Sequence, residues 1–398
     1  MKRIYLDHSA TTPLDKKVLA EMMPYFKNNF GNASSLHHFG QEAMKGIDWA
    51  REQLSHFFNC QPKEIVFTSG ASEADNLAIR GIIRYCNLKF SDKKFHIITS
   101  AFEHPAVLEV CQALERENLA EVTYVKPKTN GLIAVEDIKK AIKENTILVS
   151  IMYVNNEIGT IQPIAEIGEM IQQLNSSRDK NNIIFFHTDA VQASLYCPMD
   201  VNKLKVDLAS ISAHKIYGPK GVGALYVREK TPLKAIMFGG HQENGVRPGT
   251  YNTAGIVGLG AAVELINNGT RAKENKKIKI LRDKLIAGLT KKIKNTLING
   301  DLKHRVEANA NISFLNAEGE SILLMLDMAG IAVSTGSACA SGSLEPSHVL
   351  LSLGRKHEEC HAAIRFTLGK DNTLAEINQV IKVLPPIIER LRKMSPMK

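Results

Sequence analysis

Short apolar runs alternate with helix-like segments through much of this chain, and that alternation constrains its fold more than any other feature. The expected strands are residues 64–68, 96–99, 121–125, 146–154, 183–188, 208–212 and 223–227. The expected helices between them are residues 76–87, 106–117, 135–143 and 164–174. Strands that alternate with helices form βαβ units. The sequence therefore predicts an α/β protein with a doubly wound, mostly parallel sheet.

The pattern changes near residue 258. A long helix, a basic helix, an isolated strand at 310–314 and a C-terminal pair of helices follow. This order indicates a second, smaller α+β domain. We expect a large domain over residues 16–257, a small domain over residues 258–398, and an N-terminal segment, residues 1–15, that packs with the small domain.

The net charge of +9 raises the question of an acidic partner. Ten Lys and Arg residues lie between positions 271 and 294, where Ile278, Leu281 and Leu285 recur at helical spacing. This pattern is typical of an amphipathic helix with a basic, solvated face. A docking face for an acidic partner or RNA is the alternative. We favour the solvated face and expect no direct binding of nucleic acid.

The number and spacing of the cysteines bear on the cellular compartment and on metal binding. The six cysteines, at 60, 86, 111, 197, 339 and 360, are scattered and form no C-x-x-C pair. This spacing argues against a disulfide scaffold or a zinc ribbon and suits a reducing compartment. No run approaches the roughly 20 apolar residues of a membrane span. We expect a cytoplasmic protein with no membrane partner and no metal site.

Residues that can do chemistry follow several of the expected strands, where ligands bind in open α/β sheets. The strand at 64–68 leads into Ser69, Gly70, Ala71 and Ser72 at a helix start. Small residues there expose backbone N–H groups to a phosphate. The motif is neither a P-loop nor a dinucleotide fingerprint. Taken alone, it could be an ordinary turn with a helix cap.

Three further strand ends carry titratable side chains. His104 follows the strand at 96–99, and Asp189 follows the strand at 183–188. Asp189 could simply cap the next helix. Lys215 comes just after the strand at 208–212 and before a glycine-rich turn. It is either an edge charge or an amine in a pocket that suits Schiff-base chemistry.

Together these strand ends suggest one cofactor, pyridoxal 5′-phosphate (PLP). PLP needs a lysine for its aldehyde, a carboxylate for its ring nitrogen and a cradle for its phosphate. Lys215, Asp189 and residues 69–72 supply all three at successive strand ends.

Along essentially its whole length the chain resembles the cysteine desulfurases of the NifS/IscS type, which are class-V aminotransferases. The resemblance rests on eight motifs: 5–12 (YLDHSATT), 30–37 (FGNASSLH), 67–76 (FTSGASEADN), 154–159 (VNNEIG), 187–192 (HTDAVQ), 212–221 (SAHKIYGPKG), 247–250 (RPGT) and 336–339 (GSAC). It implies the fold-type I architecture of PLP-dependent aminotransferases.

The resemblance also implies a role for each matching residue. Lys215, His104 and Cys339 match the catalytic residues: the lysine that holds PLP, the histidine that stacks on its ring and relays protons, and the nucleophile that accepts sulfur. Asp189 and Gln192 match residues that bind the ring nitrogen and the ring hydroxyl. The expected phosphate ligands are Gly70, Ala71, Ser72, Ser212, His214 and, from across a dimer interface, Thr250. Asn155 and Arg365 match residues that bind the substrate carboxylate.

Cys339 stands out from the residues as well as from the resemblance. It lies among Ser, Thr, Gly and Ala residues at 334–343. Such a composition predicts a mobile loop in the small domain. A thiol on such a loop is exposed and reactive, in contrast to Cys86 and Cys111 on apolar helix faces.

The expected activity is cysteine desulfurization. L-Cysteine is the substrate, L-alanine the product, and a persulfide on Cys339 carries the sulfur to an acceptor. The acceptor is expected to be an iron–sulfur scaffold or a relay protein of tRNA thiolation, and the enzyme is expected to be a homodimer. Selenocysteine lysis or another class-V aminotransferase reaction is the alternative. Cys339 speaks against that alternative, because an aminotransferase needs no thiol there.

Overall fold

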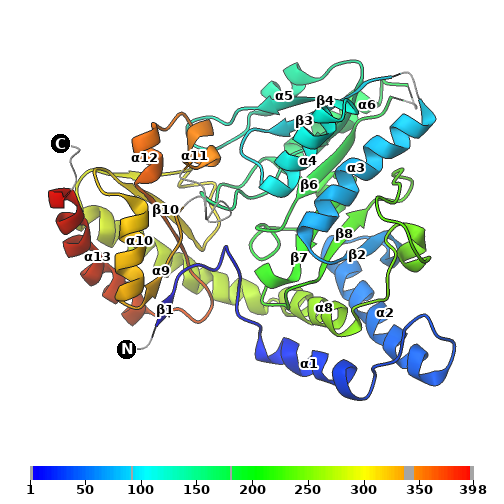
Figure 1. The fold of residues 1–398 in the computed structure, drawn as a ribbon, viewed down its shortest axis with the longest axis horizontal. Helices are drawn as coiled ribbons and strands as arrows, with labels where there is room; N and C mark the ends of the chain where they lie inside the picture. The colour runs from blue at the N-terminus through cyan, green and yellow to red at the C-terminus, as the bar shows by residue number, and fades with distance from the viewer. Residues whose placement is uncertain (1–2, 91–92, 180–181, 336–344, 395–398) are drawn as a thin grey trace.

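A computed structural model describes residues 3–90, 93–179, 182–335 and 345–394. Figure 1 shows a large sheet with helices on both of its faces, and beside it a smaller group of strands and helices near the C-terminus. The α/β class, the large mostly parallel sheet and the second α+β unit that the sequence predicts are confirmed.

The large sheet contains, in the described residues, seven strands in the order β2-β8-β7-β6-β5-β3-β4. Their bounds are β2 Ile65–Thr68, β3 Phe95–Ser100, β4 Ala120–Val125, β5 Thr146–Ser150, β6 Phe185–Asp189, β7 Leu208–Ser212 and β8 Gly223–Val227. Only β8 runs antiparallel to its neighbours. The carboxyl ends of β2, β3, β5, β6 and β7 therefore share one edge of the sheet.

Helices cover both faces of this sheet because side chains alternate along each strand. On one face lie α3 (Ala71–Lys89) and α4 (Pro105–Arg116). On the other face lie α2 (His38–Phe58), α5 (Val135–Ala141), α6 (Ile164–Asn175), α7 (Val201–Leu204) and α8 (Thr253–Asn267). Helix α1 (Lys16–Lys27) adds Val18 and Met22 to that second core.

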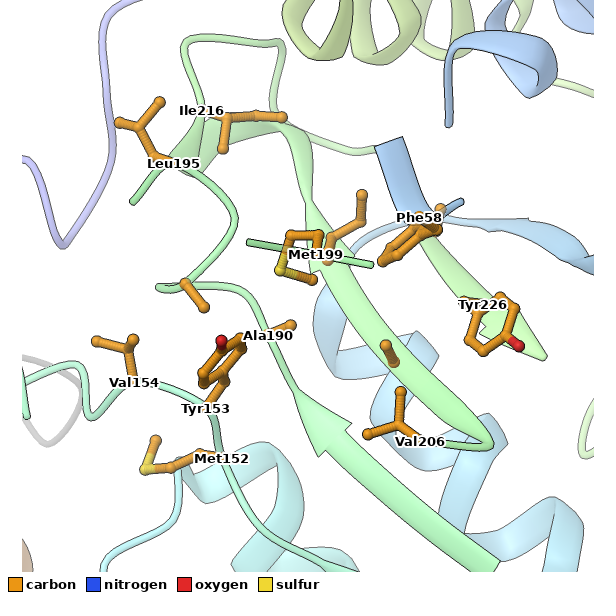
Figure 2. Close-up of a cluster of buried hydrophobic side chains, with 14 of the residues drawn as sticks. Phe58, Met152, Tyr153, Val154, Ala190, Leu195, Met199, Val206, Ile216 and Tyr226 are labelled. Atoms are coloured by element: carbon orange, nitrogen blue, oxygen red, sulfur yellow. The ribbon is translucent and has the colours of Figure 1, made fainter. Parts of the chain in front are cut away.

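The loops that follow the strands are anchored in this core. Figure 2 shows Met152 and Val154 after β5, Ala190 after β6 and Ile216 directly after Lys215. All four anchors are at most 2% exposed. Burial of these apolar side chains fixes the loops from which the polar site residues project.

The small domain is built on a three-stranded antiparallel sheet, β12-β10-β9. Its strands are β9 Thr296–Ile298, β10 Asn309–Phe314 and β12 Ala363–Thr367, and its helices are α9 Thr270–Lys292, α10 Gly319–Met328, α11 His348–Ser352, α12 His357–His361 and α13 Leu374–Met394. The strand expected alone at 310–314 is thus the central strand of a sheet. The sequence analysis missed β12.

The N-terminal segment lies against this domain. β1 (Ile4–Tyr5) pairs in parallel with β11 (Ile331–Ala332), and Ile4 and Leu6 are buried in the small-domain core. From there the chain continues past the edge of the large sheet toward α1, as Figure 1 shows.

The boundary expected between residues 257 and 258 falls inside α8. Leu259, Ala262 and Val263 of this helix are buried in the large-domain core beside α2. The small-domain core begins with Ile278 on α9. This corrects the expected boundary: α8 is apolar nearly all round, so it belongs inside the larger core, and the change of domain comes at Gly269 between the helices.

The expected strand at 146–154 is also shorter than predicted. β5 ends at Ser150, although the N–H groups of Ile151 and Tyr153 still donate to the carbonyls of His187 and Asp189 on β6. None of the helices in the described ranges is long and apolar enough to cross a membrane.

Candidate active site

A cavity of about 670 Å³ opens at the shared carboxyl edge of the large sheet. The residues that line it come from the strand ends, the N-terminal segment and the small domain: Ser9, Ala10, Thr11, Ser69, Gly70, Ala71, Ser72, Glu73, His104, Met152, Val154, Asn156, Asp189, Val191, Gln192, Ser212, His214, Lys215, Lys220, Gly221 and Arg365. Ten of the thirteen predicted site residues are among them. The other three are Asn155, Thr250 and Cys339.

One end of the cavity is the N-terminus of α3. Gly70 precedes this helix with a φ of 157°, which favours glycine. Among the described residues no side chain caps the helix start. Its backbone N–H groups therefore remain available to an anion, together with the dipole of a 19-residue helix. Glu73, in the first turn of this helix, also lines the cavity, and its carboxylate accepts the Ser69 N–H at 2.6 Å and pairs with Arg247 at 2.7 Å.

Lys215 lies at the end of β7, in the single 3₁₀ turn formed by residues 213–215. Its ammonium donates to the backbone carbonyls of Ser9 and Ala10, the latter at 2.9 Å. The backbone of Thr12 pairs with that of His214 at 2.9 Å, which fixes the N-terminal segment over this turn. The amine is thus held at the cavity wall by neutral acceptors.

Asp189 is the last residue of β6. One of its carboxyl oxygens accepts the Val191 N–H at 2.9 Å. Burial raises the pKa of Asp189 to about 6, against the effects of that N–H and of Lys215. At neutral pH the group is therefore largely a carboxylate, and it faces the cavity.

His104 forms the N-cap of α4. Its Nδ1 accepts the Ala106 N–H at 3.1 Å, which orients the ring and leaves the proton of the neutral form on Nε2. Burial, with the charge of Lys215, lowers the pKa of His104 to about 4. The ring is therefore neutral at physiological pH, as a flat wall of the cavity.

Gln192 and His214 both reach the N-terminal segment. The Gln192 amide donates to the Ser9 carbonyl at 3.0 Å, and His214 Nδ1 lies 3.2 Å from the Thr11 hydroxyl. Burial lowers the pKa of His214 to about 4, with Lys215 and Lys220 nearby. His214 is thus a neutral hydrogen-bonding group.

Arg365 enters the cavity from the small domain. It lies on β12 and is 2% exposed. Its Nη2 donates to the Asp7 carboxylate at 2.9 Å and its Nη1 to the Asn156 carbonyl at 3.1 Å. Its Nε is buried without a hydrogen-bond partner among the described residues. A donor with no acceptor beside a cavity is suited to a carboxylate ligand.

The substrate-binding role expected of Asn155 stays a prediction, and in this structure its side chain is hydrogen-bonded within its own region of the large domain. Its amide donates to the Phe102 carbonyl and contacts the Met152 sulfur, and its oxygen accepts the N–H groups of Glu157 and Ile158. All of its hydrogen-bonding capacity thus supports the loop after β5. The neighbouring Asn156 lines the cavity instead.

The two remaining predicted residues are Thr250 and Cys339. Thr250 is exposed, on a loop whose Arg247 is paired with Glu73, and it does not line the cavity of its own chain. Cys339 lies outside the described residues.

The cavity fits PLP on the chemistry of its walls. An uncapped helix start, Ser72 and Lys220 suit a phosphate. The Asp189 carboxylate suits a protonated ring nitrogen, and the Lys215 amine suits an aldehyde.

Sequence reasoning missed the residues contributed by the N-terminal segment. Ser9, Ala10 and Thr11 line the cavity, and Asp7 holds Arg365. The available signal was the polar pair Asp7-His8 directly after an apolar run. Lys220 lies in a motif that the sequence analysis quoted without giving this residue a role.

Comparison with known proteins gives a consistent result. The family model described as aminotransferase class-V matches residues 4–380. A protein named cysteine desulfurase IscS, from Clostridium botulinum (strain Hall), is 50% identical over 398 residues, which covers 100% of this chain and 97% of that protein. A protein of the same name from Dictyoglomus turgidum is 48% identical, covering 100% of this chain and 98% of its own.

Two solved structures extend the likeness to the fold. A NifS-like protein is 36% identical with a TM-score of 0.88, covering 98% of this chain and 100% of its own. A structure titled SspA in complex with cysteine is also 36% identical, with a TM-score of 0.79 and coverage of 93% and 100%.

Proposed function

The chain belongs to the class-V aminotransferase family and, within it, to the cysteine desulfurases of the IscS type, and we propose that it removes sulfur from L-cysteine as a persulfide on Cys339. The observation that carries this proposal is the meeting of Lys215, Asp189 and a buried Arg365 in one cavity. The first two suit PLP, and the third suits the carboxylate of an amino acid.

PLP, when bound, supplies an electron sink that weakens the bonds at the α-carbon of an amino acid. Lys215 would hold the cofactor covalently and would be the base that takes the α-proton of the substrate on its Nζ. Asp189 would supply a negative charge for the ring nitrogen, and the neutral His104 would pack against the ring. Each residue is fixed by its own strand end, so the groups need little rearrangement before they act.

Arg365 binds the substrate carboxylate with donors that remain after its bond to Asp7. Asp7 and the Asn156 carbonyl fix two corners of the guanidinium, and the buried Nε has no hydrogen-bond partner in the part of the chain that the structure describes. A carboxylate that accepts this Nε–H receives a charge-assisted hydrogen bond in a dry site. The amino group of the substrate is then turned toward Lys215.

Sulfur transfer forms one bond and breaks another. The Cys339 thiolate attacks the sulfur of the substrate, an S–S bond forms, and the carbon–sulfur bond breaks. The electron pair of the broken bond goes to the carbon skeleton, which takes up a proton and leaves as L-alanine. The sulfur stays on Cys339 as a persulfide.

Replacement of Cys339 by serine tests the proposal. Cys339→Ser should still bind PLP and L-cysteine, but alanine formation should fall at least roughly hundred-fold because a hydroxyl is a poor sulfur nucleophile. Mass spectrometry should find an added sulfur on the Cys339 peptide of the wild type and none on the variant. Cys60→Ser, at a partly exposed cysteine outside the cavity, is the matched control and should keep activity. Near-wild-type alanine formation by Cys339→Ser would instead indicate lyase or transaminase chemistry.

We also propose that the enzyme is a homodimer. Large apolar side chains on α1, on α2 and between them are exposed: Phe26 (61%), Phe30 (68%), Leu36 (91%) and Phe39 (52%). A surface of this kind is typical of an interface, and a second copy would cover it. Thr250, exposed and away from its own cavity, is then free to reach the phosphate of the neighbouring subunit.

Light scattering tests the dimer. The double variant Phe30→Glu, Phe39→Glu should shift the protein toward a monomer with weakened PLP binding. Leu88→Glu, equally exposed at 68% but at the far end of α3, should remain a dimer. A wild type that is active as a monomer at micromolar concentration would contradict the proposal.

The further partners and the compartment follow from the same chemistry. We propose that the persulfide passes to a protein of iron–sulfur cluster assembly or tRNA thiolation, because a relative that is 50% identical to this chain carries the name IscS. Transfer of labelled sulfur from the loaded enzyme to each candidate acceptor would identify it. We propose the cytoplasm as the compartment, since the five cysteines of the described residues are unpaired thiols. Cell fractionation would test this.

A further inference from the structure

A second layer of polar side chains lies beneath Asp189, on the face of the sheet that α3 and α4 cover. Side chains two apart on a strand share a face. On β6 the series is Phe185, His187 and Asp189, and on β7 the residues Leu208 and Ser210 lead to the cavity in the same way. The apolar core therefore changes to a buried polar layer one step before the cavity begins.

Asp75 is the α3 residue that faces this layer. It is 0% exposed, and its Oδ1 lies 3.5 Å from the Nε2 of His187. Neither carboxyl oxygen makes a hydrogen bond within the described part of the chain. A fully buried carboxyl group without an established partner needs an explanation, because its burial is costly.

The contact with His187 is not an ion pair. His187 lies between two hydroxyls, with Nδ1 2.8 Å from Ser150 Oγ and Nε2 3.0 Å from Ser210 Oγ. Complete burial lowers the pKa of His187 to about 3. The imidazole is therefore neutral and gives Asp75 no positive charge.

The other titratable groups near Asp75 are acids. Asp189 lies toward the cavity, and Glu103 lies at the end of β3. Glu103 accepts bonds from Ser100 and from the Met152 N–H, and burial raises its pKa to about 8. Within the described residues Asp75 has no Lys or Arg within ion-pair distance.

Asp189 has partners that stabilise its negative charge, and Asp75 lacks them among the described residues. The Asp189 carboxylate accepts the Val191 N–H, is attracted by the charge of Lys215 and lines the cavity. When two carboxyl groups are close in a medium of low polarity, the pair ionises once before it ionises twice. The first charge goes to the group with the better partners.

We propose that Asp75 is a positioning residue that stays protonated behind Asp189, so that the pair carries one negative charge and that charge resides on the group facing the cavity. This inference rests on the proposed function, because Asp189 is given its role there. Burial, together with repulsion from Asp189, raises the pKa of Asp75 well above its usual value, although the nearby Ser210 hydroxyl favours the charged form.

The consequence concerns the ring nitrogen of the cofactor. A protonated Asp75 is a neutral hydrogen-bond donor, and it leaves Asp189 as the carboxylate that opposes the positive charge of the nitrogen. If Asp75 lost its proton, the second buried charge would drive Asp189 to take up a proton and lose its hold on the nitrogen.

Infrared spectroscopy of the full-length protein without cofactor tests the protonation directly. Aspartate labelled with ¹³C at its carboxyl carbon shifts the band of a protonated aspartic acid and leaves that of Glu103 unshifted. At pH 8 Asp189 and Asp207, with pKa values near 6, are ionised. A label-sensitive band of a protonated carboxyl should remain at pH 8 and disappear in Asp75→Asn. Its absence from the wild type would overturn the proposal.

A pair of matched variants tests the effect on the cofactor. The same change of Asp to Asn should have a large effect on PLP affinity at position 189 and almost none at position 75. Asp189→Asn removes the charge and should weaken PLP binding by roughly a hundred-fold, whereas Asp75→Asn keeps a neutral donor and should stay within about threefold of the wild type. Asp75→Leu removes the polar group that faces His187 and Ser210 and should weaken PLP binding by about tenfold. A mere filler of space would tolerate leucine.

The outcomes remain distinct. If Asp75→Asn loses PLP as strongly as Asp189→Asn, or if Asp75→Leu binds PLP like the wild type, the proposal is overturned. If Asp75→Asn does not fold, the presence or absence of the label-sensitive band in the wild type at pH 8 still tests whether a buried aspartic acid stays protonated. If the wild type itself does not bind PLP, the proposed function fails, and the infrared result still judges the protonation of Asp75.

Discussion

The two ends of the cavity are built in different ways. The cofactor end consists of Ser72, Asp189 and Lys215. All three lie at the ends of strands of the large sheet or at the start of the helix that follows such a strand. The substrate end consists of Asp7, Asn156 and Arg365, which come from the N-terminal segment, the large domain and the small domain. Asp7 and Arg365 are 358 positions apart in the chain.

The positions of the side chains are therefore set by different interactions at the two ends. At the cofactor end the sheet hydrogen bonds set the spacing of the side chains, so the geometry is inherited from the backbone. At the substrate end the geometry depends on how the small domain packs on the large one. We therefore expect changes at the two ends to have separable effects, on PLP binding and chemistry in one case and on substrate affinity in the other.

The largest effect is expected at the cofactor end. Lys215→Ala removes both the covalent attachment of PLP and the base that takes the α-proton, so alanine formation should fall by roughly 10³-fold or more. Borohydride treatment followed by peptide mapping should find no PLP fixed to the chain. Lys220→Ala, which changes a lysine of the same cavity, should keep the attachment. Fixation of PLP to the Lys215 variant would show that another residue holds it.

Substitutions at the substrate end should raise KM instead. Arg365→Lys loses a fork of donors that a single ammonium cannot replace, at about 1.5–3 kcal/mol, so KM for L-cysteine should rise roughly 10- to 100-fold. Asp7→Asn weakens the support of the guanidinium and should raise KM less. Steady-state kinetics would be compared with PLP titrations, in which both variants should match the wild type. A parallel loss of PLP affinity would break the distinction between the two ends.

A pH dependence of PLP affinity is expected at the cofactor end. The pKa of Asp189 is raised to about 6, so the group is charged above that pH and neutral below it. PLP affinity should therefore fall as the pH drops below 6, by up to about tenfold per unit.

Inorganic phosphate provides the control for this experiment. It probes the phosphate cradle without a ring nitrogen, so its own response to pH reports the phosphate and histidine contributions. Equal losses of affinity for PLP and for phosphate between pH 7 and pH 5 would remove Asp189 as the cause.

The smallest effect is expected at Ser72. Ser72→Ala removes one hydroxyl from a cradle that also has backbone N–H groups, so PLP affinity should fall by about threefold to tenfold. The rate at saturating PLP and KM for L-cysteine should stay unchanged. Ser72→Thr keeps the hydroxyl and should bind PLP like the wild type. A changed KM would mean that the cradle also shapes the substrate end.

The cofactor end was predictable because its signals are local. The strands that end at Asp189 and Ser212 are short, mostly buried segments of five residues, and polar residues at the ends of such strands mark a site at the sheet edge. Lys215 follows the second run directly. Each inference required only a few neighbouring residues.

The substrate end was only partly predictable. Arg365 was found by resemblance, while its strand β12 was missed, because a run of five residues with a central arginine has no clear strand pattern. Asn155 was expected to bind the substrate carboxylate, whereas in the structure its neighbour Asn156 lines the cavity. The two asparagines are adjacent and identical in type. The conformation of the turn after β5 decides which of them faces the cavity, and that conformation cannot be predicted from the sequence of the turn alone.

The sequence by itself determined the α/β class, the edge of the sheet where the cavity lies and the chemistry of its cofactor end. Periodicity and strand-end composition act over a few residues, so they can be read locally. The tertiary structure alone decided that α8 belongs to the large core, that Asp7 holds Arg365, and that Asp75 lies buried behind Asp189. Each of these facts depends on packing between segments distant in the chain, and the burial that results, rather than residue type, sets which carboxyl group carries the charge.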